Sequence, residues 1–339
     1  MLWVTPTDIK SNITLDTDKK LSLSGVKVAR VIPENSILCT CIASIGKNTF
    51  LPVKCAFNQQ INALSPSDDN DPYFLYTNSY HWSQTMKKGA GGLTFQIVNK
   101  TEFSDINTFI PIKEEQVKIG ILFKQLDDII TLHQRKFEAL SNIKKALLEK
   151  MFPANGEVTP KIRFAGFTEA WEQCKAKDIC SINTGKSNTQ DQTDDGTYPF
   201  YIRSDIPVKS NKYLYDCEAV ITIGDGNIGK VFHYVNGKFD LHQRCYKMTD
   251  FKDIYGKYFY YFFSTKFYKR AMSMTAKTSV DSVRLEMISE MDIQYPKNIQ
   301  EQIKLASILT NLDNLITLHQ RKCEKLKNIK KALLEKMFV

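Results

Sequence analysis

Apolar residues recur at three- and four-residue steps along two long stretches of the chain. In the first stretch they are Leu122, Leu126, Ile129, Leu140, Ile143, Leu147 and Met151, with His133 interrupting the series. This spacing predicts a helix with one apolar stripe and a seam like that of a coiled coil. Pro111, followed by an acidic pair, marks its start, and Pro153 marks its end. About 39 residues at ~1.5 Å each form a rod of roughly 57 Å, whose stripe needs a partner.

The same helix occurs a second time. Leu126–Phe152 and Leu312–Phe338 are identical at 22 of 27 positions without a gap. The second copy, about Ile299–Phe338, is therefore the expected partner of the first. Sequence alone does not choose the orientation of the pair, but an antiparallel pair would place the two preceding domains at opposite ends of the rod, in an internal near-twofold arrangement.

The residues before each helix also correspond, although more weakly. NSILCTCIASIGKNTF, NQQINAL and YFLYTNSYHW precede the first helix, and CEAVITIGDGNIGKVF, LHQRCYKM and YFYYFFSTKFY precede the second. The pair Gly46-Lys47 falls opposite Gly229-Lys230. We therefore predict a mixed α/β (α+β) fold with two diverged copies of a domain followed by a helix. The boundaries are 1–112 for the first domain, 113–152 for its helix, 153–162 for a linker, 163–298 for the second domain and 299–339 for its helix.

Composition is that of a globular protein large enough for two packed domains. Of the 339 residues, 42% are hydrophobic and 24% are charged. No run approaches the roughly 18 to 20 apolar residues of a membrane span, and the first residues do not resemble a signal peptide, so we expect a cytoplasmic protein without membrane contact. The eight cysteines show neither a CxxC pair nor zinc-like spacing and are expected to be reduced, mostly buried thiols.

The net charge of +9 is concentrated on the two helices. Residues 113–152 carry 8 Lys and Arg against 6 Asp and Glu, and residues 299–339 carry 8 against 4, so the helices account for six of the nine charges. The two domains are only mildly basic, and a phosphate-binding face would have to arise from the way folding segregates their charges.

Several of these stretches together carry a family resemblance. They are ILCTCIASIGKN, NQQINAL, the AGG near Gly91, the P-x-x-x-EQ-x-x-I lead into the first helix and the closing LLEKMF. In this duplicated layout, which covers nearly the whole chain, they resemble the specificity subunit of type I restriction-modification systems. The resemblance implies that each domain is a target recognition domain reading one half of a split sequence in double-stranded DNA, and that the helices pack antiparallel as a spacer.

The resemblance also implies partners and the absence of chemistry in this chain. The helices would carry the contact surface for two methyltransferase (modification) subunits, to which restriction subunits are added. S-adenosylmethionine, ATP and Mg would then be bound only by those partner subunits, with no cofactor, metal or catalytic residue here. The expected contact residues are Gln134, Arg135, Lys136, Lys144 and Lys145 on the first helix and Gln320, Arg321, Lys322, Lys330 and Lys331 on the second.

Candidate DNA-contacting residues are polar or basic side chains at predicted strand ends and turns. In the second domain they are Arg203, Ser204, Asn227, Lys230, Gln243, Arg244, Lys277, Thr278 and Ser279, and in the first domain Lys47, Gln59, Gln60, Gly91 and Gly92. Arginine, glutamine and asparagine can make paired hydrogen bonds to guanine or adenine edges, whereas lysine serves phosphates.

The first domain departs from the pattern at its start. Its Trp3–Ile9 match Phe200–Ile206, so residues 163–199 of the second domain, 37 residues, have no counterpart in it. In the family, Trp171–Gly185 would form the first strand and turn of the domain. We therefore expect the first domain to be incomplete, its DNA reading to be weakened, and specificity to depend mainly on the second domain.

Three motifs invite other interpretations. GDGNIGK, Gly224–Lys230, fits the core of a phosphate-binding loop, but Val231 replaces the Ser or Thr that holds magnesium, and the residues that follow read as strands with a turn at Asn236-Gly237. NDPYF, from Asn70, resembles the base-gripping loop of amino-methyltransferases but lacks its second proline and an upstream glycine-rich cofactor loop, and reads as a surface turn before a helix.

The third motif is TLHQRK, which occurs on both helices and contains His133 and His319. A histidine at the same place on two helices indicates a polar position in the seam, or a contact with an identical partner, rather than catalysis. Two other classes of protein stay open: a coiled-coil interaction module that binds methyltransferase subunits without full DNA reading and, less favoured, a fused methyltransferase.

Overall fold

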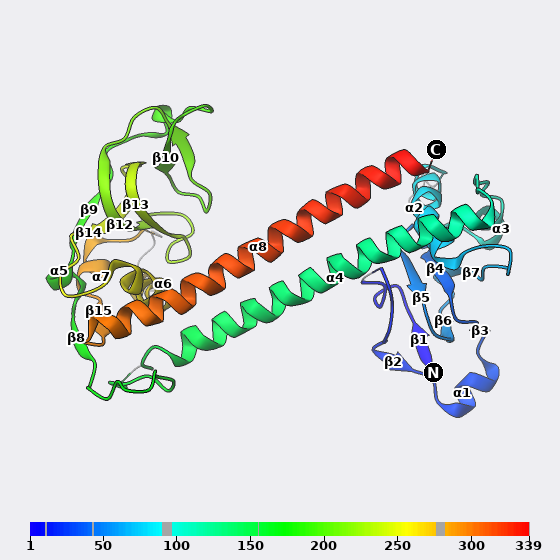
Figure 1. Ribbon diagram of the computed structural model, residues 1–339, viewed down its shortest axis with the longest axis horizontal. Helices are drawn as coiled ribbons and strands as arrows, with labels where there is room; N and C mark the ends of the chain where they lie inside the picture. The colour runs from blue at the N-terminus through cyan, green and yellow to red at the C-terminus, as the bar shows by residue number, and fades with distance from the viewer. Residues whose placement is uncertain (11, 43, 90–96, 155, 276–281, 339) are drawn as a thin grey trace. The chain divides into compact units, whose positions relative to one another are not determined.

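The computed structural model describes residues 1–10, 12–42, 44–89, 97–154, 156–275 and 282–338 (Figure 1). The chain divides into two compact units. Unit 1 holds residues 1–137 and 318–339, and unit 2 holds residues 138–317. Each unit thus contains part of both long helices, α4 (Lys113–Lys150) and α8 (Ile299–Met337).

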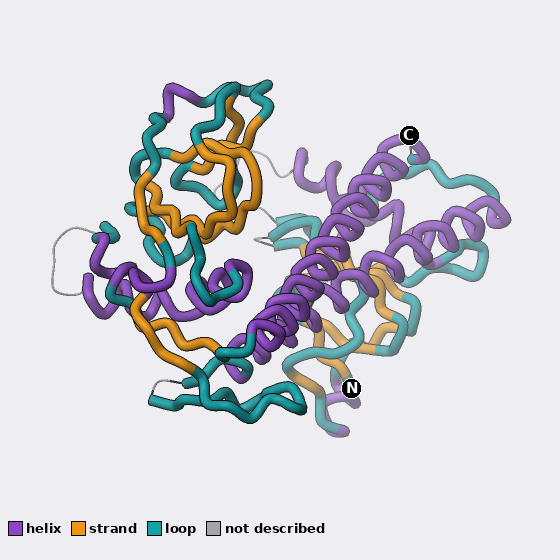
Figure 2. The backbone as a smooth tube through the Cα atoms, turned by 60° about the vertical axis from the view of Figure 1, so that its left-hand side comes forward, coloured by secondary structure: helices purple, strands orange, loops and turns teal. Residues whose placement is uncertain are grey.

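Unit 2 is built on a six-stranded sheet with the order β11-β10-β13-β12-β14-β9. The strands are β9 (Ser181–Thr184), β10 (Tyr198–Tyr201), β11 (Val208–Ser210), β12 (Tyr215–Ile223), β13 (Phe232–Leu241) and β14 (Cys245–Thr249). A separate antiparallel pair joins β8 (Glu172–Lys175) to β15 (Asp292–Tyr295). Short helical turns are α5 (Ala176–Ile179), η1 (Thr189–Asp191) and α7 (Leu285–Ser289). Figure 2 shows the larger sheet of this unit curving above its helices.

Helix α6 (Gly256–Thr275) forms the core of unit 2. It packs against β12 and β13. Its buried aromatic side chains belong to one apolar cluster with Leu305 and Leu309 of α8, and they are Tyr258, Phe259, Tyr261, Phe262, Phe263 and Phe267. The aromatic stretch before the second helix is thus a buried helix face that anchors α8 to the domain.

Unit 1 contains two smaller sheets. The order of the first is β2-β1-β6-β3 and that of the second is β5-β4-β7. The strands are β1 (Leu2–Val4), β2 (Lys19–Lys20), β3 (Val31–Ile32), β4 (Ser36–Thr40), β5 (Asn48–Leu51), β6 (Cys55–Phe57) and β7 (Ile61–Leu64), and the helices before α4 are α1 (Leu23–Val28), α2 (Pro72–Gly89) and α3 (Lys100–Ser104). The helix predicted from YFLYTNSYHW is α2.

The strand pairing confirms the weaker repeat. Strand β1 runs parallel to β6, as β10 does to β13, and β4 lies between β5 and β7, as β12 lies between β13 and β14. Two strands of unit 2 are each divided in unit 1, at Pro33 between β3 and β4 and at Pro52 between β5 and β6. A proline has no N–H to give to a neighbouring strand, which accounts for both breaks.

One local prediction for unit 2 is wrong. Asn236 and Gly237 do not form a turn but lie inside β13, opposite Glu218 and Cys217 of β12. Gly237 has φ of 129°, a conformation that costs other residues more than glycine, so the strand passes through this point without turning. The turn occurs instead at His242–Arg244.

Within each unit the two long helices pair antiparallel. In unit 1, Asp127 contacts Lys330 while His133, further along α4, contacts the earlier residue His319 of α8. In unit 2, Lys144 contacts Asp313. The two ion pairs are equivalent in the repeat, because Asp313 and Lys330 each lie 186 residues after Asp127 and Lys144 respectively. The predicted antiparallel pairing of the two helices is therefore present in the contacts within each unit.

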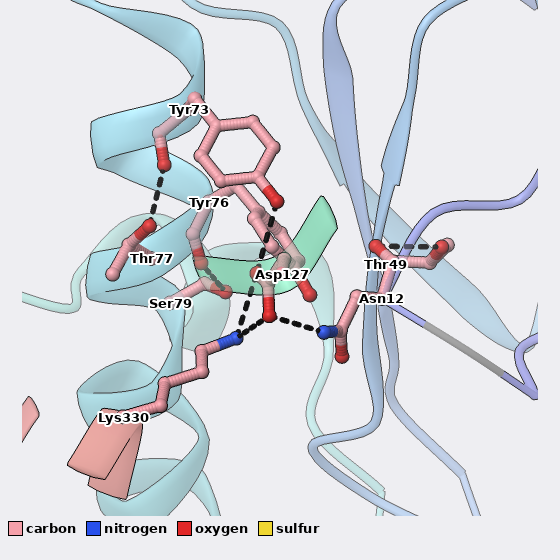
Figure 3. Close-up of polar contacts among 8 residues, drawn as sticks. All are labelled: Asn12, Thr49, Tyr73, Tyr76, Thr77, Ser79, Asp127 and Lys330. Carbon is pink, nitrogen blue, oxygen red and sulfur yellow. Dashed lines mark hydrogen bonds and ion pairs between the residues drawn. The ribbon is translucent and has the colours of Figure 1, made fainter. Parts of the chain in front are cut away.

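Asp127 is the polar centre of unit 1 (Figure 3). Its side chain is 2% exposed and accepts hydrogen bonds from Tyr73 Oη (2.9 Å), from Asn12 Nδ2 (2.7 Å) and from Lys330 Nζ (2.6 Å). Burial and the adjacent Asp127 charge raise the pKa of Tyr73, so its hydroxyl stays a donor. One carboxylate thus joins α2, α4, α8 and the strand region near Asn12.

A buried glutamine fixes the start of each long helix. Gln116 donates to Pro111 O (2.9 Å) and accepts from the N–H of Asp71 (3.0 Å), just before α2. Gln302 donates to Pro296 O (2.8 Å) and accepts from the N–H of Tyr255 (2.7 Å), just before α6. The Pro and Gln that occur in both lead sequences therefore hold each long helix against the helix of its own domain.

The predicted apolar stripe is partly wrong. Leu122, Ile129 and Ile143 are 37%, 43% and 49% exposed, whereas the buried positions of α4 include Ile119, Phe123 and Ile130. Hydrophobic periodicity predicted the wrong buried face of α4, because the helix buries the polar residues Gln116 and Asp127 and exposes apolar residues beside the seam. The expected seam position of His133 is confirmed by its contact with His319.

The cysteines are as expected from the sequence. All eight cysteines are free thiols, six of them buried and Cys174 and Cys217 partly so. In the part of the chain that the structure describes, no helix is long and apolar enough to cross a membrane.

The two symmetry-related ion pairs make a matched test of burial. Lys330→Ala leaves the Asp127 carboxylate buried without its cation and is expected to lower the free energy of unfolding by about 3 kcal/mol. Lys144→Ala removes the same contact at Asp313, whose side chain is 35% exposed, and is expected to cost less than about 1 kcal/mol. Urea unfolding of both variants measures the difference. Equal losses would contradict the structural asymmetry.

The histidine pair predicts a pH dependence of stability. The two Nδ1 atoms lie 2.8 Å apart, and burial, His319, Lys322 and Lys136 lower the pKa of His133 from its usual 6.5. The unfolded chain therefore takes up the proton first, and stability falls as the pH drops through about 6.5 toward the folded pKa. Compared with the wild type, His133→Gln should show a smaller loss of urea midpoint between about pH 7.5 and pH 5.5. The other histidines are common to both proteins, so an equal loss of urea midpoint in the wild type and in His133→Gln would contradict the prediction.

Candidate nucleic-acid interface

Three loops of unit 2 bring polar side chains together at one end of the sheet. Arg203 follows β10, Asp225 and Asn227 lie in the turn between β12 and β13, and Arg244 lies in the turn before β14. Because β10, β13 and β12 are neighbours in the sheet, these turns converge even though they are separated in sequence. The predicted contacts Arg203, Asn227 and Arg244 therefore fall in one region.

Asp225 holds both arginines. Arg203 Nη1 lies 3.1 Å from Asp225 Oδ1, and Arg244 Nη1 lies 2.8 Å from Oδ2. Burial acts to raise the pKa of Asp225, but the hydrogen bonds and charges of the two arginines outweigh it and lower the pKa overall. The carboxylate is thus charged at neutral pH and orients two guanidinium groups whose side chains are still 45% and 61% exposed.

A hollow of about 430 Å³ lies beside this cluster. It is lined by Thr189, Ile202, Arg203, Asp225, Gly226, Asn227 and His242. His242 Nδ1 accepts from the N–H of Arg244 (3.0 Å), which leaves Nε2 toward Thr189 Oγ1 at 3.4 Å. Burial and the charges of Arg203 and Arg244 lower the pKa of His242, so the ring is neutral at neutral pH. The hollow therefore offers donors and acceptors of several kinds.

The glycine turn is not a nucleotide-binding loop. The residues after Gly224–Lys230 continue into the strand β13, whereas a phosphate-binding loop continues into a helix whose N-terminus faces the phosphate. Gly229 has φ of 66°, and a Cβ at this position would lie 2.9 Å from Tyr268 Cα. Lys230 is exposed, with Nζ 5.7 Å from the ring centre of Tyr268. This outcome fits the strand–turn–strand interpretation.

The other predicted contacts are scattered. Gln243 is exposed beside Arg244, whereas Ser204 is half-buried and its Oγ donates to Ile206 O (2.6 Å) within its own loop. Lys277, Thr278, Ser279, Gly91 and Gly92 lie outside the described residues.

Unit 1 places its candidates in the same turns but with different chemistry. The N–H of Asn58 donates to Val4 O, and the N–H of His242 donates to Tyr201 O, both at 3.0 Å. The two turns therefore correspond, and Gln59 and Gln60 occupy the places of Gln243 and Arg244. Gln59 is exposed, while Gln60 is half-buried and bonded to Asn58. Lys47 is exposed and follows Gly46, which has φ of 78°, as Lys230 follows Gly229.

Among the residues of unit 1 that the structure describes, the arginine cluster has no counterpart. The correspondence of Val4 with Tyr201 places Pro6 opposite Arg203, and the backbone bridge of Ile42 to Ile97 matches that of Asp225 to Ser282. The three positions of the cluster are therefore Pro6, Ile42 and Gln60 in unit 1. The two domains present different chemistry at the same end of the sheet.

Sequence reasoning missed Asp225 and His242. Both lie close in sequence to residues that were predicted to contact DNA. An aspartate is not expected at a site that binds the DNA anion unless its two arginine partners are known. Those partners are 22 and 19 residues away in sequence, and only the sheet order brings them together.

The predicted partner surface on the helices is partly wrong. Lys144 and Lys330 are not free for a partner, because their side chains are 25% and 17% exposed and pair with Asp313 and Asp127. The remaining selected residues are exposed: Gln134, Arg135, Lys136, Lys145, Gln320, Arg321, Lys322 and Lys331.

Beside these residues, the helices expose apolar side chains at equivalent positions. The pairs related by 186 residues are Leu122 and Ile308, Ile129 and Leu315, Leu132 and Leu318, and Ile143 and Ile329, each between 36% and 51% exposed. Their spacing places them on one side of each helix. The same apolar surface is thus present twice in one chain.

Comparison with known proteins identifies the family. The family described as type I restriction modification DNA specificity domain matches residues 3–142 and 168–328, and the chain belongs to this family. The duplicate match agrees with the internal repeat. The chain is accordingly a specificity subunit of type I restriction-modification systems, with a role in DNA target recognition.

Individual relatives are distant. The chain is 24% identical over 341 residues to the MjaVIII specificity subunit of Methanocaldococcus jannaschii, a match that covers 90% of this chain and 78% of the relative. It is 31% identical over 156 residues to the HindI specificity subunit of Haemophilus influenzae, covering 43% of this chain and 32% of the relative.

Solved structures agree on the fold. The crystal structure of a type I restriction-modification S subunit from M. genitalium matches with a TM-score of 0.77 at 16% identity, covering 100% of this chain and 88% of that one. At this identity the likeness concerns the fold alone.

Proposed function

We propose that unit 2 reads one part of a split target in double-stranded DNA through the loops around Asp225. The observation that carries this proposal is the convergence of Arg203 and Arg244, both exposed, on one aspartate at the end of the sheet. A guanidinium can bind the O6 and N7 of guanine with two hydrogen bonds. Holding it in place beforehand reduces the entropy lost on binding.

The surrounding residues fit the same role. Asn227 can pair with an adenine edge, Asp225 can accept a hydrogen bond from cytosine N4, and Lys230 can contact a phosphate. Gln243 is the further exposed donor beside Arg244. In unit 1, we propose that Lys47 and Gln59 make the corresponding contacts, with less contribution to specificity because Pro6 and Ile42 replace the charged cluster.

We propose that the chain catalyses no reaction itself. Its partners would be two methyltransferase subunits, which supply S-adenosylmethionine chemistry, and restriction subunits, which use ATP and Mg, in the cytoplasm. The support is the family's specificity role together with the exposed arginines of the site, which have the chemistry to contact bases. Transfer of labelled methyl groups by the isolated chain would contradict this proposal.

Two substitutions separate base reading from phosphate binding. Arg244→Ala is expected to cost about 1 to 3 kcal/mol of discrimination between the target and a target changed at one base pair. Lys230→Ala is expected to weaken binding to all sequences alike and to reduce the salt slope by about one. DNA binding of the complex with partner subunits, measured at several salt concentrations, tests both.

The target for that measurement comes from methylation mapping by long-read sequencing in a host that carries the partner subunits. A target specified mainly in one half is the expected pattern. A fully specified split target would show that unit 1 reads DNA as well as unit 2. No methylation at all would favour the alternative, an interaction module without full DNA reading.

The repeated helix surface predicts two copies of one partner. Ile129→Asp on α4 and Leu315→Asp on α8 place a charge in the exposed apolar surface, and each is expected to reduce the bound methyltransferase subunits from two to one. Mass photometry of the purified complex measures the number. Asn142→Asp, exposed about 100° around α4 from Ile143, is the matched control and should retain two. A wild-type complex that saturates at one copy would contradict the proposal.

A further inference from the structure

Unit 1 contains a hollow of about 420 Å³ between α2, the segment before α4, and the end of α8. Its walls include Phe74, Trp82, Ile119 and Phe338, all nearly or fully buried. On its rim, Phe109 is 90% exposed and Ile110 is 47% exposed. Exposed large apolar residues around a hollow of this kind are typical of interaction sites.

The repeat shows what the corresponding place holds in unit 2. There the segment before the long helix is β15, which pairs antiparallel with β8, and Ile293 and Tyr295 are 0% and 6% exposed. Just before β8, Trp171 packs on Tyr258 of α6, with ring centres 6.0 Å apart. Residues 163–175 therefore cover this surface in unit 2.

A buried ion pair anchors the same segment. Arg163 Nε and Nη2 donate to Glu301 Oε1 and Oε2 at 2.7 and 2.9 Å, and the Glu301 side chain is 1% exposed. Two parallel bonds of this kind require the planar guanidinium of arginine. Glu301 of α8 thus binds the arginine at the start of this segment.

Unit 1 has the residues that correspond to the surface bound by this segment in unit 2. Glu115 lies 186 residues before Glu301 and corresponds to it in the repeat. Its side chain is exposed, lines the hollow and makes no ion pair with the residues that the structure describes. The Nε1 of Trp82 is buried and has no hydrogen-bond partner within the same described ranges. The segment 106–110 lies where β15 lies in unit 2 but pairs with no described strand.

We propose that this hollow, with Glu115 and the edge at Asn107–Ile110, is a docking site for an extended polypeptide segment. The segment would have the chemistry of residues 163–175: an arginine for Glu115, an aromatic residue about eight positions later, and a short strand that pairs with Asn107–Ile110. Main-chain hydrogen bonds would supply affinity, and the arginine and aromatic side chains would supply specificity. Charge complementarity and the filled counterpart in unit 2 both point to this occupant.

A peptide with the sequence of residues 161–176 is the probe. Labelled at its N-terminus and titrated with the full chain under reducing conditions, it is expected to bind with a Kd in the micromolar range by fluorescence anisotropy. Glu115→Arg should weaken binding at least tenfold, and a peptide with glutamate at the position of Arg163 should restore it. Phe109→Asp, at a fully accessible site, should also weaken binding at least tenfold without affecting the fold.

Glu114→Arg is the matched control, since it makes the same charge change at the neighbouring exposed residue. It should bind the original peptide as the wild type does. Absence of binding would overturn the proposal, as would binding that is insensitive to both Glu115→Arg and Phe109→Asp, because the peptide would then occupy another place. The measurement uses no DNA and is independent of how the target is read.

Discussion

The ion pair between Asp127 and Lys330 joins α4 to α8 at the polar centre of unit 1. The carboxylate accepts hydrogen bonds from a tyrosine of α2 and from the strand region while it neutralises a lysine of α8. A buried charge of this kind is tolerated only if its partners are fixed in position. It therefore determines which face of α4 meets α8 and where the domain sits on the helix. Asp313 and Lys144 perform the same task in unit 2 with greater exposure.

Around this constraint the two copies have diverged in an uneven way. The contacts that join a domain to its helix are retained almost atom for atom, as in the bonds of Gln116 and Gln302. The loops at the far end of the sheet have changed their chemistry, with Arg203, Asp225 and Arg244 in one copy and Pro6, Ile42 and Gln60 in the other. A fixed frame with variable loops is what a protein requires if it is to read different sequences with one architecture.

The helices and their pairing could be predicted because 27 residues occur twice with few changes, and a repeat of that kind needs no tertiary information. The glycine turn at Gly229 could also be located, since Gly46-Lys47 repeats it. The seam face was misplaced, because Asp127 and Gln116 are polar residues that become buried only through partners distant in sequence. Asp225 and His242 were missed for a similar reason, and the exposed state of Ile129 depends on the helix crossing rather than on periodicity.

The ion pairs have a consequence for the symmetry of the chain. Asp127 and Lys144 lie on the same helix, as do Asp313 and Lys330, so each repeat carries one acid and one base of the two bridges. The helix surface of one repeat therefore carries both an acid and the base that pairs with that acid in another copy. A self-complementary surface of this kind is the condition for an isologous contact between identical copies. In this chain two copies of that surface are covalently joined, so the loops of each copy can change separately while the contacts between the helices remain the same.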